Sequence, residues 1–283
     1  MKTFTKIKEI KAVVGKHRAS GNRIGFVPTM GFLHEGHLSL VKESVRQTDC
    51  SVVSIFVNPT QFGPGEDFHE YPRDLDRDSA LLKEQGVDYL FIPDKKEMYP
   101  EGFRTYVEVK DLQDRFEGKS RPGHFRGVCT VVLKLLEIVK ADVAFFGQKD
   151  AQQAAIIKRM VRDLDLDVDI RVLPIVRDED GLALSSRNIY LSKPERKAAT
   201  CLARSLREAG RLIEGGEKDP RIIQDTMRRK IDSEPLADLE YIAFVDLDNF
   251  NPLDRIEGEV LIAVAANFGA TRLIDNMIFS HKE

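Results

Sequence analysis

Two histidines three residues apart are the first feature of the chain that could do chemistry. His34 and His37 end the segment PTMGFLHEGH, which follows a predicted strand and opens a predicted helix. The carboxyl ends of strands in an open α/β sheet face the ligand crevice, and N–H groups at a helix start favour anions. Gly36 would let a ligand approach the backbone closely. The segment predicts a phosphate site served by two imidazoles; the alternative is one surface and one core histidine.

Two further polar segments have the composition of phosphate sites. Gly147–Asp150 (GQKD) lies between a predicted strand and a predicted helix, where Lys149 could place a point charge on phosphate. Asp150 is also a possible helix N-cap. Residues 184–188 (LSSRN) combine hydroxyls with a guanidinium, which suits a triphosphate, although such residues are also ordinary turn formers.

Other chemical motifs are excluded by single positions. Gly118-Lys119-Ser120 resembles the end of a P-loop, but Gln113 stands where the first glycine is required. Gly63-Pro64-Gly65 resembles the start of a dinucleotide-binding GxGxxG motif, but Phe68 stands where its third glycine is required. The spacing of His34 and His37 does not match a zinc-binding HExxH motif.

Composition narrows the class of protein. The 283 residues carry 43 Lys and Arg against 46 Asp and Glu, a net charge of −3, so the basic excess of a nucleic-acid binder is missing. The 42% hydrophobic content excludes a disordered chain. The first residues are too polar for a signal peptide, and the longest apolar run, near Val260–Ala266, is too short to span a membrane. We therefore expect a soluble protein that binds neither nucleic acid nor membrane.

The cysteines indicate a reducing compartment. The chain has three cysteines, Cys50, Cys129 and Cys201, which lie far apart in the sequence. An odd number of distant cysteines disfavours a disulfide framework and favours the cytoplasm. We expect each to be a small buried apolar residue.

Apolar periodicity predicts alternating strands and helices in the first part of the chain. We expect strands at 24–28, 51–57, 88–93, 105–109, 142–146 and 167–176, and helices at 5–19, 34–47, 127–140 and 151–163, with another opened by Pro72. Strands that are apolar on both faces and alternate with helices are typical of a parallel sheet. The fold class predicted is therefore α/β, a Rossmann-like parallel sheet flanked by helices.

The pattern changes after residue 176. Helices at 194–215 and 220–231 precede strands at 240–246, 260–268 and 272–279, which predicts a smaller α+β domain with antiparallel pairing. We therefore place a Rossmann-like domain at 1–175 and a smaller C-terminal α+β domain at 176–283.

Taken together, these segments resemble the HxGH nucleotidyltransferase superfamily, whose second signature is a mobile KMSKS-like loop. The segments PTMGFLHEGH, FVNPTQF, YPRDLDRD, RPGHFRGV, FFGQKDAQQ and LALSSRN are together similar to those of the pantoate–β-alanine ligase family. The resemblance covers residues 23–190 most strongly. It implies that the domain at 1–175 binds the nucleotide and pantoate, and that the C-terminal domain carries the KMSKS-like loop.

The resemblance implies an ATP-dependent condensation of (R)-pantoate with β-alanine through pantoyl adenylate, giving pantothenate, AMP and pyrophosphate. It implies Mg²⁺ as cofactor, a cytoplasmic homodimer, and catalytic roles for His37, His34, Lys149 and Arg187. The ATP ligands implied are Met30, Gly31, Phe32, Leu33, His34, Glu35, Gly36, His37, Gly147, Gln148, Lys149, Asp150, Val176, Leu184, Ser185, Ser186 and Arg187.

For the other substrates, the resemblance implies that Gln61 and Gln153 bind pantoate and that Gln61 also lies at the β-alanine site. Asn58, Arg121 and His124 are weaker candidates, the last two in a segment expected to be mobile. Two alternatives stay open: an adenylyltransferase that stops at nucleotidyl transfer, and a non-catalytic nucleotide sensor on the same fold.

Overall fold

The computed structural model describes residues 1–280, which fall into two compact units. The first unit comprises residues 1–147 and 152–174, and the second comprises residues 148–151 and the chain from Ile175 onward. The segment Gln148–Ala151 therefore packs with the C-terminal part of the chain, although the predicted boundary lies after residue 175. That domain division stays a prediction.

The first unit is built on a parallel sheet of six strands in the order β1-β4-β3-β2-β5-β6. The strands are β1 (Lys2–Phe4), β2 (Ile24–Thr29), β3 (Cys50–Ile55), β4 (Tyr89–Phe91), β5 (Val143–Gly147) and β6 (Asp169–Leu173). From β2 the chain moves outward through β3 to β4, whereas β5 and β6 continue on the other side of β2. Such a reversal of strand order creates a ligand crevice at the carboxyl ends of the two central strands.

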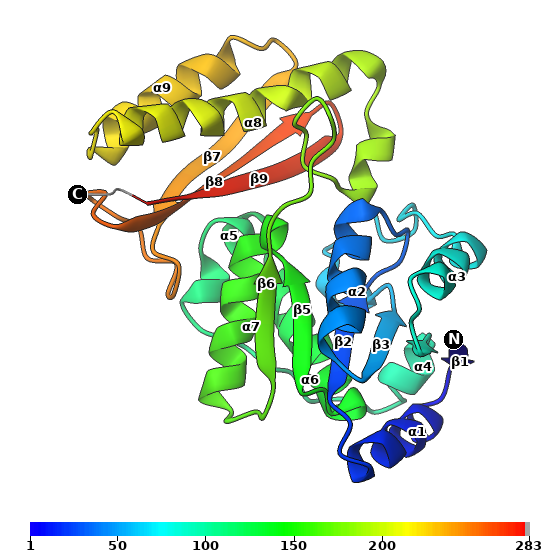
Figure 1. Ribbon diagram of the computed structural model, residues 1–283. Coiled ribbons are helices and arrows are strands. Elements are labelled where there is room, and N and C mark those ends of the chain that lie inside the picture. Colours follow the sequence, from blue (N-terminus) through cyan, green and yellow to red (C-terminus); the bar gives the residue numbers. More distant parts are fainter. Residues whose placement is uncertain (281–283) are drawn as a thin grey trace. The chain divides into compact units, whose positions relative to one another are not determined.

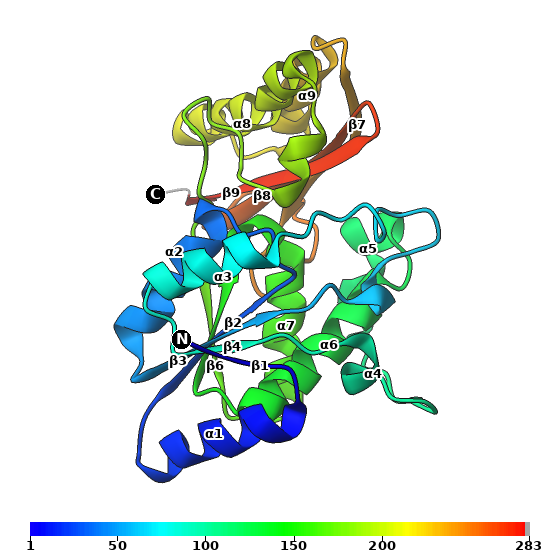
Figure 2. The same cartoon turned by 90° about the vertical axis from the view of Figure 1, so that its right-hand side faces the viewer.

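Helices cover both faces of this sheet. The helices of the first unit are α1 (Ile7–Ala19), α2 (Glu35–Gln47), α3 (Leu75–Glu84), α4 (Lys95–Met98), α5 (Glu117–Ser120), α6 (His124–Val139) and α7 (Ala151–Asp163). Short 3₁₀ turns are η1 (Pro59–Gln61), η2 (Leu112–Asp114) and η3 (Gln148–Asp150), the last of which packs with the second unit. Helix α2 packs against β2, β3 and β5, while α1 and α6 pack together over β2 (Figure 1 and Figure 2). The apolar runs of β2 and β3 are buried because both faces are covered.

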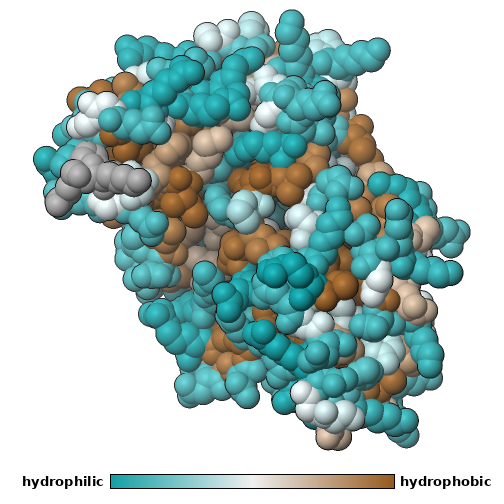
Figure 3. Space-filling model, viewed as in Figure 1, coloured by the Kyte–Doolittle hydropathy of each residue, from teal (hydrophilic) through white to brown (hydrophobic). Residues whose placement is uncertain are grey.

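The second unit pairs helices with an antiparallel sheet. Turn η4 (Ser186–Tyr190) precedes α8 (Lys193–Glu214), α9 (Pro220–Asp232), β7 (Ala237–Val245), β8 (Glu259–Phe268) and β9 (Thr271–Ser280), and the strand order is β7-β8-β9. Both helices bury one apolar face in a core shared with the sheet. Their outward surface is largely hydrophilic in the face shown by Figure 3.

Most predicted elements are confirmed, and the errors have local causes. Residues 105–109 form no strand, because the backbone N–H of Val107 donates to Thr130 Oγ1 of α6 (3.1 Å) instead of to a neighbouring strand. Helix α3 begins at Leu75 rather than at Pro72, because Asp74 caps it by accepting from the N–H of Arg77 (3.1 Å). Strand β1, which pairs in parallel with β4, was not expected.

The three cysteines are buried and free, as expected. Burial raises the pKa of each thiol to about 12. In residues 1–280 no helix combines the length and apolar character that crossing a membrane requires.

Candidate active site

The histidine pair is fixed by the start of helix α2. His34 is the N-cap, and its Nδ1 accepts from the N–H of Gly36 (3.1 Å), while the N–H of His34 donates to Nδ1 of His37 (3.4 Å). The two rings lie 4.1 Å apart between centroids. Because each Nδ1 is an acceptor, a neutral ring carries its proton on Nε2. The capping box thus makes Nε2 the donor atom of both imidazoles.

The loop that leads into this pair has an unusual backbone. Gly31 and Phe32 both have positive φ angles, +85° and +51°. The carboxylate of Asp78, which is 1% exposed, accepts from the N–H groups of Phe32 (2.7 Å) and Leu33 (2.8 Å). Burial raises the pKa of Asp78, and these hydrogen bonds oppose that rise. A Cβ at Gly31 would lie 3.1 Å from Asp78 Oδ2, so glycine suits both the φ angle and the close approach.

A pocket of about 320 Å³ opens beside this loop within the first unit. Its walls come from the ends of β2, β3 and β4 and the start of α3, and they are mainly apolar: Met30, Gly31, Phe32, Ile55, Phe56, Val57, Pro59, Phe68, Arg73, Asp74, Leu75, Asp78, Ile92, Pro93 and Lys95. Of the predicted ATP ligands, Met30, Gly31 and Phe32 line this pocket.

Gln61 is held in turn η1 by its neighbour Asn58. Asn58 is 1% exposed; its Nδ2 donates to Gln61 Oε1 (3.0 Å) and to the carbonyl of Gly127 (3.1 Å). Its Oδ1 accepts from Thr60 Oγ1 (2.9 Å) and Tyr99 Oη (2.8 Å). With Oε1 engaged, the amide nitrogen of Gln61 is left as the donating end, and it points to Met30 Sδ (3.2 Å). Asn58, a weak sequence candidate for substrate binding, is thus placed to orient Gln61.

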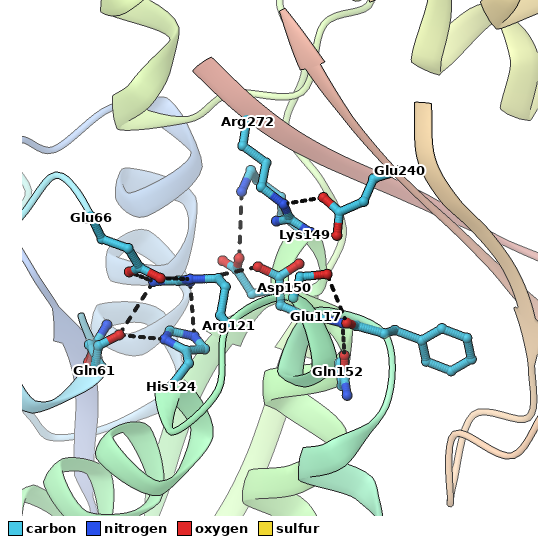
Figure 4. A network of polar contacts seen from close by, with 12 residues as sticks. Gln61, Glu66, Glu117, Arg121, His124, Lys149, Asp150, Gln152, Glu240 and Arg272 are labelled. Carbon is cyan, nitrogen blue, oxygen red and sulfur yellow. Dashed lines mark hydrogen bonds and ion pairs between the residues drawn. The ribbon is translucent and has the colours of Figure 1, made fainter. Parts of the chain in front are cut away.

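A second set of contacts holds the backbone of Gln61 (Figure 4). Nδ1 of His124 lies 2.8 Å from the carbonyl oxygen of Gln61, so this nitrogen carries a proton, and Nε2 accepts from Arg121 (3.2 Å). Arg121 also donates to both carboxylate oxygens of Glu66 (2.9 and 2.6 Å). Burial alone would raise the pKa of Glu66, but these bonds lower it below its ordinary value. We name Glu66, Arg121, His124 and Gln61 the polar relay.

Helix α6 approaches this turn so closely that one position requires glycine. A Cβ at Gly127 would lie 2.3 Å from the carbonyl oxygen of Thr60 and 2.6 Å from the nitrogen of Gln61. The segment RPGHFRGV therefore supplies both the relay donors, Arg121 and His124, and the glycine that lets them reach the turn. His124 is 8% exposed and begins α6.

The two glutamines at the start of α7 differ in burial. Gln153, a predicted pantoate ligand, is half-buried in the first turn. Gln152 is 6% exposed and donates to the carbonyls of Leu112 (2.7 Å) and Arg115 (2.8 Å), while accepting from the N–H of Glu117 (3.1 Å; Figure 4). Gln152 therefore holds the loop before α6.

The predicted ATP ligands at 30–37, and Gly147 at the end of β5, belong to the first unit, and those at 148–150, 176 and 184–187 belong to the second. Gln148, Lys149 and Asp150 form turn η3, and Lys149 Nζ lies 3.5 Å from the Asp150 carboxylate. The N–H of Leu184 donates to the carbonyl of Val176 (3.0 Å). Ser185 caps η4 by accepting from the N–H of Arg187 (3.3 Å), while Ser186 is buried.

Comparison with known proteins identifies the family. The family model for pantoate-beta-alanine ligase matches residues 2–278. The chain is 57% identical to pantothenate synthetase of Caldicellulosiruptor saccharolyticus over 273 residues, 96% of this chain and 97% of the relative. It is also 57% identical to pantothenate synthetase of Thermosipho africanus over 278 residues, 98% of this chain and 100% of the relative.

Solved structures agree with this assignment. Pantothenate synthetase from Thermus thermophilus superposes with a TM-score of 0.94 at 45% identity, covering 98% of this chain and 99% of that one. Pantoate-beta-alanine ligase from Francisella tularensis, complexed with beta-gamma ATP and beta-alanine, has a TM-score of 0.81 at 36% identity, covering 98% and 97%. The predicted family and fold class are therefore confirmed: the chain belongs to the pantoate–β-alanine ligase family.

Proposed function

We propose that the chain joins pantoate to β-alanine in two steps. The pantoate carboxylate attacks the α-phosphorus of ATP, giving pantoyl adenylate and releasing pyrophosphate. The amine of β-alanine then attacks the acyl carbon, giving pantothenate and releasing AMP. The single observation that carries the proposal is the capping box of α2, which sets two Nε2 donors side by side in a chain of this family.

The chemistry needs positive and donor groups around the phosphates. A carboxylate is a poor acylating agent because its leaving group is oxide, and adenylation replaces that group with AMP. Negative charge accumulates at the α-phosphate as the new bond forms, so fixed donors lower the barrier. We assign this task to His34 and His37 of the first unit and to Lys149 and Arg187 of the second.

Pantoate is assigned to amide side chains. The donating nitrogen of Gln61, fixed by Asn58, suits a carboxylate oxygen, and Gln153 supplies a second amide. Neutral donors bind a carboxylate without suppressing its attack as strongly as a full positive charge would. We place the β-alanine site next to Gln61 as well.

Magnesium is assigned to the nucleotide rather than to a protein cage. Among residues 1–280, no group of three or more His, Cys, Asp and Glu side chains is placed to hold a metal ion. Mg²⁺ keeps several waters and often binds through substrate phosphates, so phosphate oxygens and water fit its needs here. Bound in this way, it would neutralise part of the phosphate charge.

We also propose a cytoplasmic homodimer. Free, buried cysteines with raised pKa values suit a reducing compartment. Light scattering over a range of concentrations would give the mass of the assembly, and a mass of one chain at all concentrations would contradict the dimer.

Isotope exchange between pyrophosphate and ATP tests the stepwise scheme. Exchange should require pantoate but not β-alanine, and adding β-alanine should yield AMP and pantothenate. Exchange only with all three substrates would contradict the scheme. A dinucleotide-like product would favour an adenylyltransferase, and ATP binding with no pyrophosphate release would favour a sensor.

A further inference from the structure

Two polar residues interrupt the otherwise largely apolar strand β9. Asp275 and Asn276 stand in the middle of TRLIDNMIFS and are 3% and 2% exposed. A buried carboxylate and a buried amide cost free energy unless their hydrogen bonds are satisfied. Their partners therefore show what the pair does.

Asn276 binds the turn that carries Lys149. Its Nδ2 donates to the main-chain carbonyls of Gln148 (2.9 Å) and Lys149 (3.0 Å), and its Oδ1 accepts from Gln148 Nε2 (3.1 Å). One amide thus makes three hydrogen bonds to two successive residues of η3. These bonds account for the packing of residues 148–151 with the second unit rather than with strand β5, which precedes them.

Asp275 binds the segment that leads to Arg187. Its two carboxylate oxygens accept from Arg177 at 2.6 and 2.8 Å, a bidentate pair. Arg177 also donates to the carbonyl of Gly181 (3.1 Å) and pairs with Ala183 in an antiparallel bridge. Asp275 thereby fixes the folded-back segment 177–183, which directly precedes the LSSR sequence at 184–187.

Successive side chains of a strand point to opposite faces of its sheet. Position 276 therefore reaches the turn that carries Lys149, while position 275 reaches the segment that leads to Arg187. We infer that Asn276 and Asp275 are positioning residues for the adenylation step: Asn276 sets the backbone of Lys149, and Asp275 sets the loop before Arg187. This inference rests on the proposed function, because it presupposes that Lys149 and Arg187 act on ATP.

The consequence of losing Asn276 follows from its contacts. In Asn276→Ala the carbonyls of the half-buried residues Gln148 and Lys149 lose this donor, and η3 is free to shift relative to β9. A displacement of about 1 Å at a reacting group can cost about 10²-fold in rate. We expect adenylate formation to fall by about that factor. Attack of β-alanine on pantoyl adenylate involves neither the β- nor the γ-phosphate of ATP, so this second step should be slowed much less.

The experiment separates the two half-reactions. Single-turnover pyrophosphate release with ATP and pantoate measures the first, and pantothenate formation from synthetic pantoyl adenylate and β-alanine measures the second. The variants are Asn276→Ala and Asn276→Asp, the latter similar in size but bringing a carboxylate oxygen against the two carbonyls. Asn267→Ala is the matched control, because Asn267 is a half-buried asparagine of the adjacent strand β8. Thermal unfolding of each variant reports on folding.

Loss of the first half-reaction with the second retained, together with a raised KM for ATP and a wild-type control, supports the inference. First-step rates within about twofold of wild type, or equal loss of both steps, would overturn it. If Asn276→Ala does not fold, Asn276→Asp is judged by the same criterion. Failure of the proposed function is a different result: the wild-type protein would then show no pantoate-dependent pyrophosphate release.

Discussion

The two regions assigned to phosphate binding are held in place over very different distances along the chain. In the first unit, His34 and His37 fix each other within three residues, through backbone bonds at the start of one helix. In the second unit, Gln148 and Lys149 are fixed by Asn276, 128 and 127 residues away. The histidine geometry follows from a helix cap, whereas the Lys149 turn takes its position only when strand β9 has formed.

This comparison distinguishes the residues that act on a substrate from the residues that hold them in place. A local arrangement leaves a recognisable sequence, because the residues that act and those that hold them belong to one short segment. When the supporting residues lie far away in the chain, only the residues that act can be recognised in the sequence. Substitutions that break each kind of support should therefore have different signatures.

The largest expected effect follows from removing a phosphate donor from either region. In His37→Asn the amide oxygen can still accept from the N–H of His34, but no donor remains at the position of Nε2. Arg187→Ala removes the guanidinium. Each should lower single-turnover pyrophosphate release by roughly 10²–10³-fold, the usual cost of one such donor.

The double variant sharpens this prediction. Because both groups are assigned to the same phosphate charge, we expect the combined loss to be smaller than the product of the single losses. His69→Asn, a substitution of an exposed histidine, is the control. Wild-type release in either single variant, or full multiplicativity, would contradict the shared role.

A smaller effect is expected at Gln61, which is held by the nearby Asn58 and by His124, 63 residues away in the chain. Gln61→Ala should raise the KM for pantoate by roughly 10–100-fold through loss of a hydrogen bond to a charged group, while ATP affinity is kept. Asn58→Ala should raise the same KM and also lower the free energy of unfolding by about 1–3 kcal/mol, because the buried Oε1 of Gln61 loses its donor.

Steady-state kinetics and urea unfolding of both variants check the pair of predictions. Equal destabilisation by the two substitutions would show that Gln61 is also structural. Calorimetry showing ATP affinity falling as much as pantoate affinity would show that Gln61 does not belong to the pantoate site.

These contacts explain how far the sequence could predict the structure. The alternation of apolar strands and helices predicted the parallel sheet, because burial on both faces leaves a continuous apolar pattern. The segment PTMGFLHEGH predicted that the two histidines lie at the start of a helix, because a helix start depends on residues that are close in the sequence. The family and its ligase activity were likewise predicted from six segments and are confirmed.

What sequence could not predict depends on distant partners. Asp78 shapes the loop at Phe32 and Leu33 from 45 or more residues away, and nothing in its own helix marks it for that task. Asn276 has a signal, a polar pair inside an apolar strand, but the pattern does not name its partner. Residues 105–109 look like a strand because they alternate, yet their backbone bonds to a helix side chain.

A more modest effect is expected at His124, which holds the backbone of Gln61. In His124→Asn the amide nitrogen can take the place of Nδ1 and still donate to the Gln61 carbonyl, whereas in His124→Leu no donor remains. We expect the KM for pantoate to rise by about fivefold in His124→Leu and by less in His124→Asn, consistent with about 1 kcal/mol for one hydrogen bond. Identical KM values in the two variants would show that the hydrogen bond from His124 to Gln61 does not help to position the substrate.

The smallest effect concerns Glu66, the outer end of the polar relay. Its side chain is 24% exposed, and its bonds with Arg121 outweigh the effect of burial and lower its pKa below the ordinary value of 4.5. A carboxylate with a lowered pKa in the folded state stabilises the protein above its ordinary pKa, and this contribution is lost as pH falls through the folded value. Glu66→Gln should therefore lower the free energy of unfolding by about 1 kcal/mol at pH 7, and the difference from wild type should shrink below pH 4.5. Urea unfolding across this range measures the difference, with Glu101→Gln, at an exposed position, as control. A difference that stays constant with pH would mean that Glu66 contributes through packing and not through its charge.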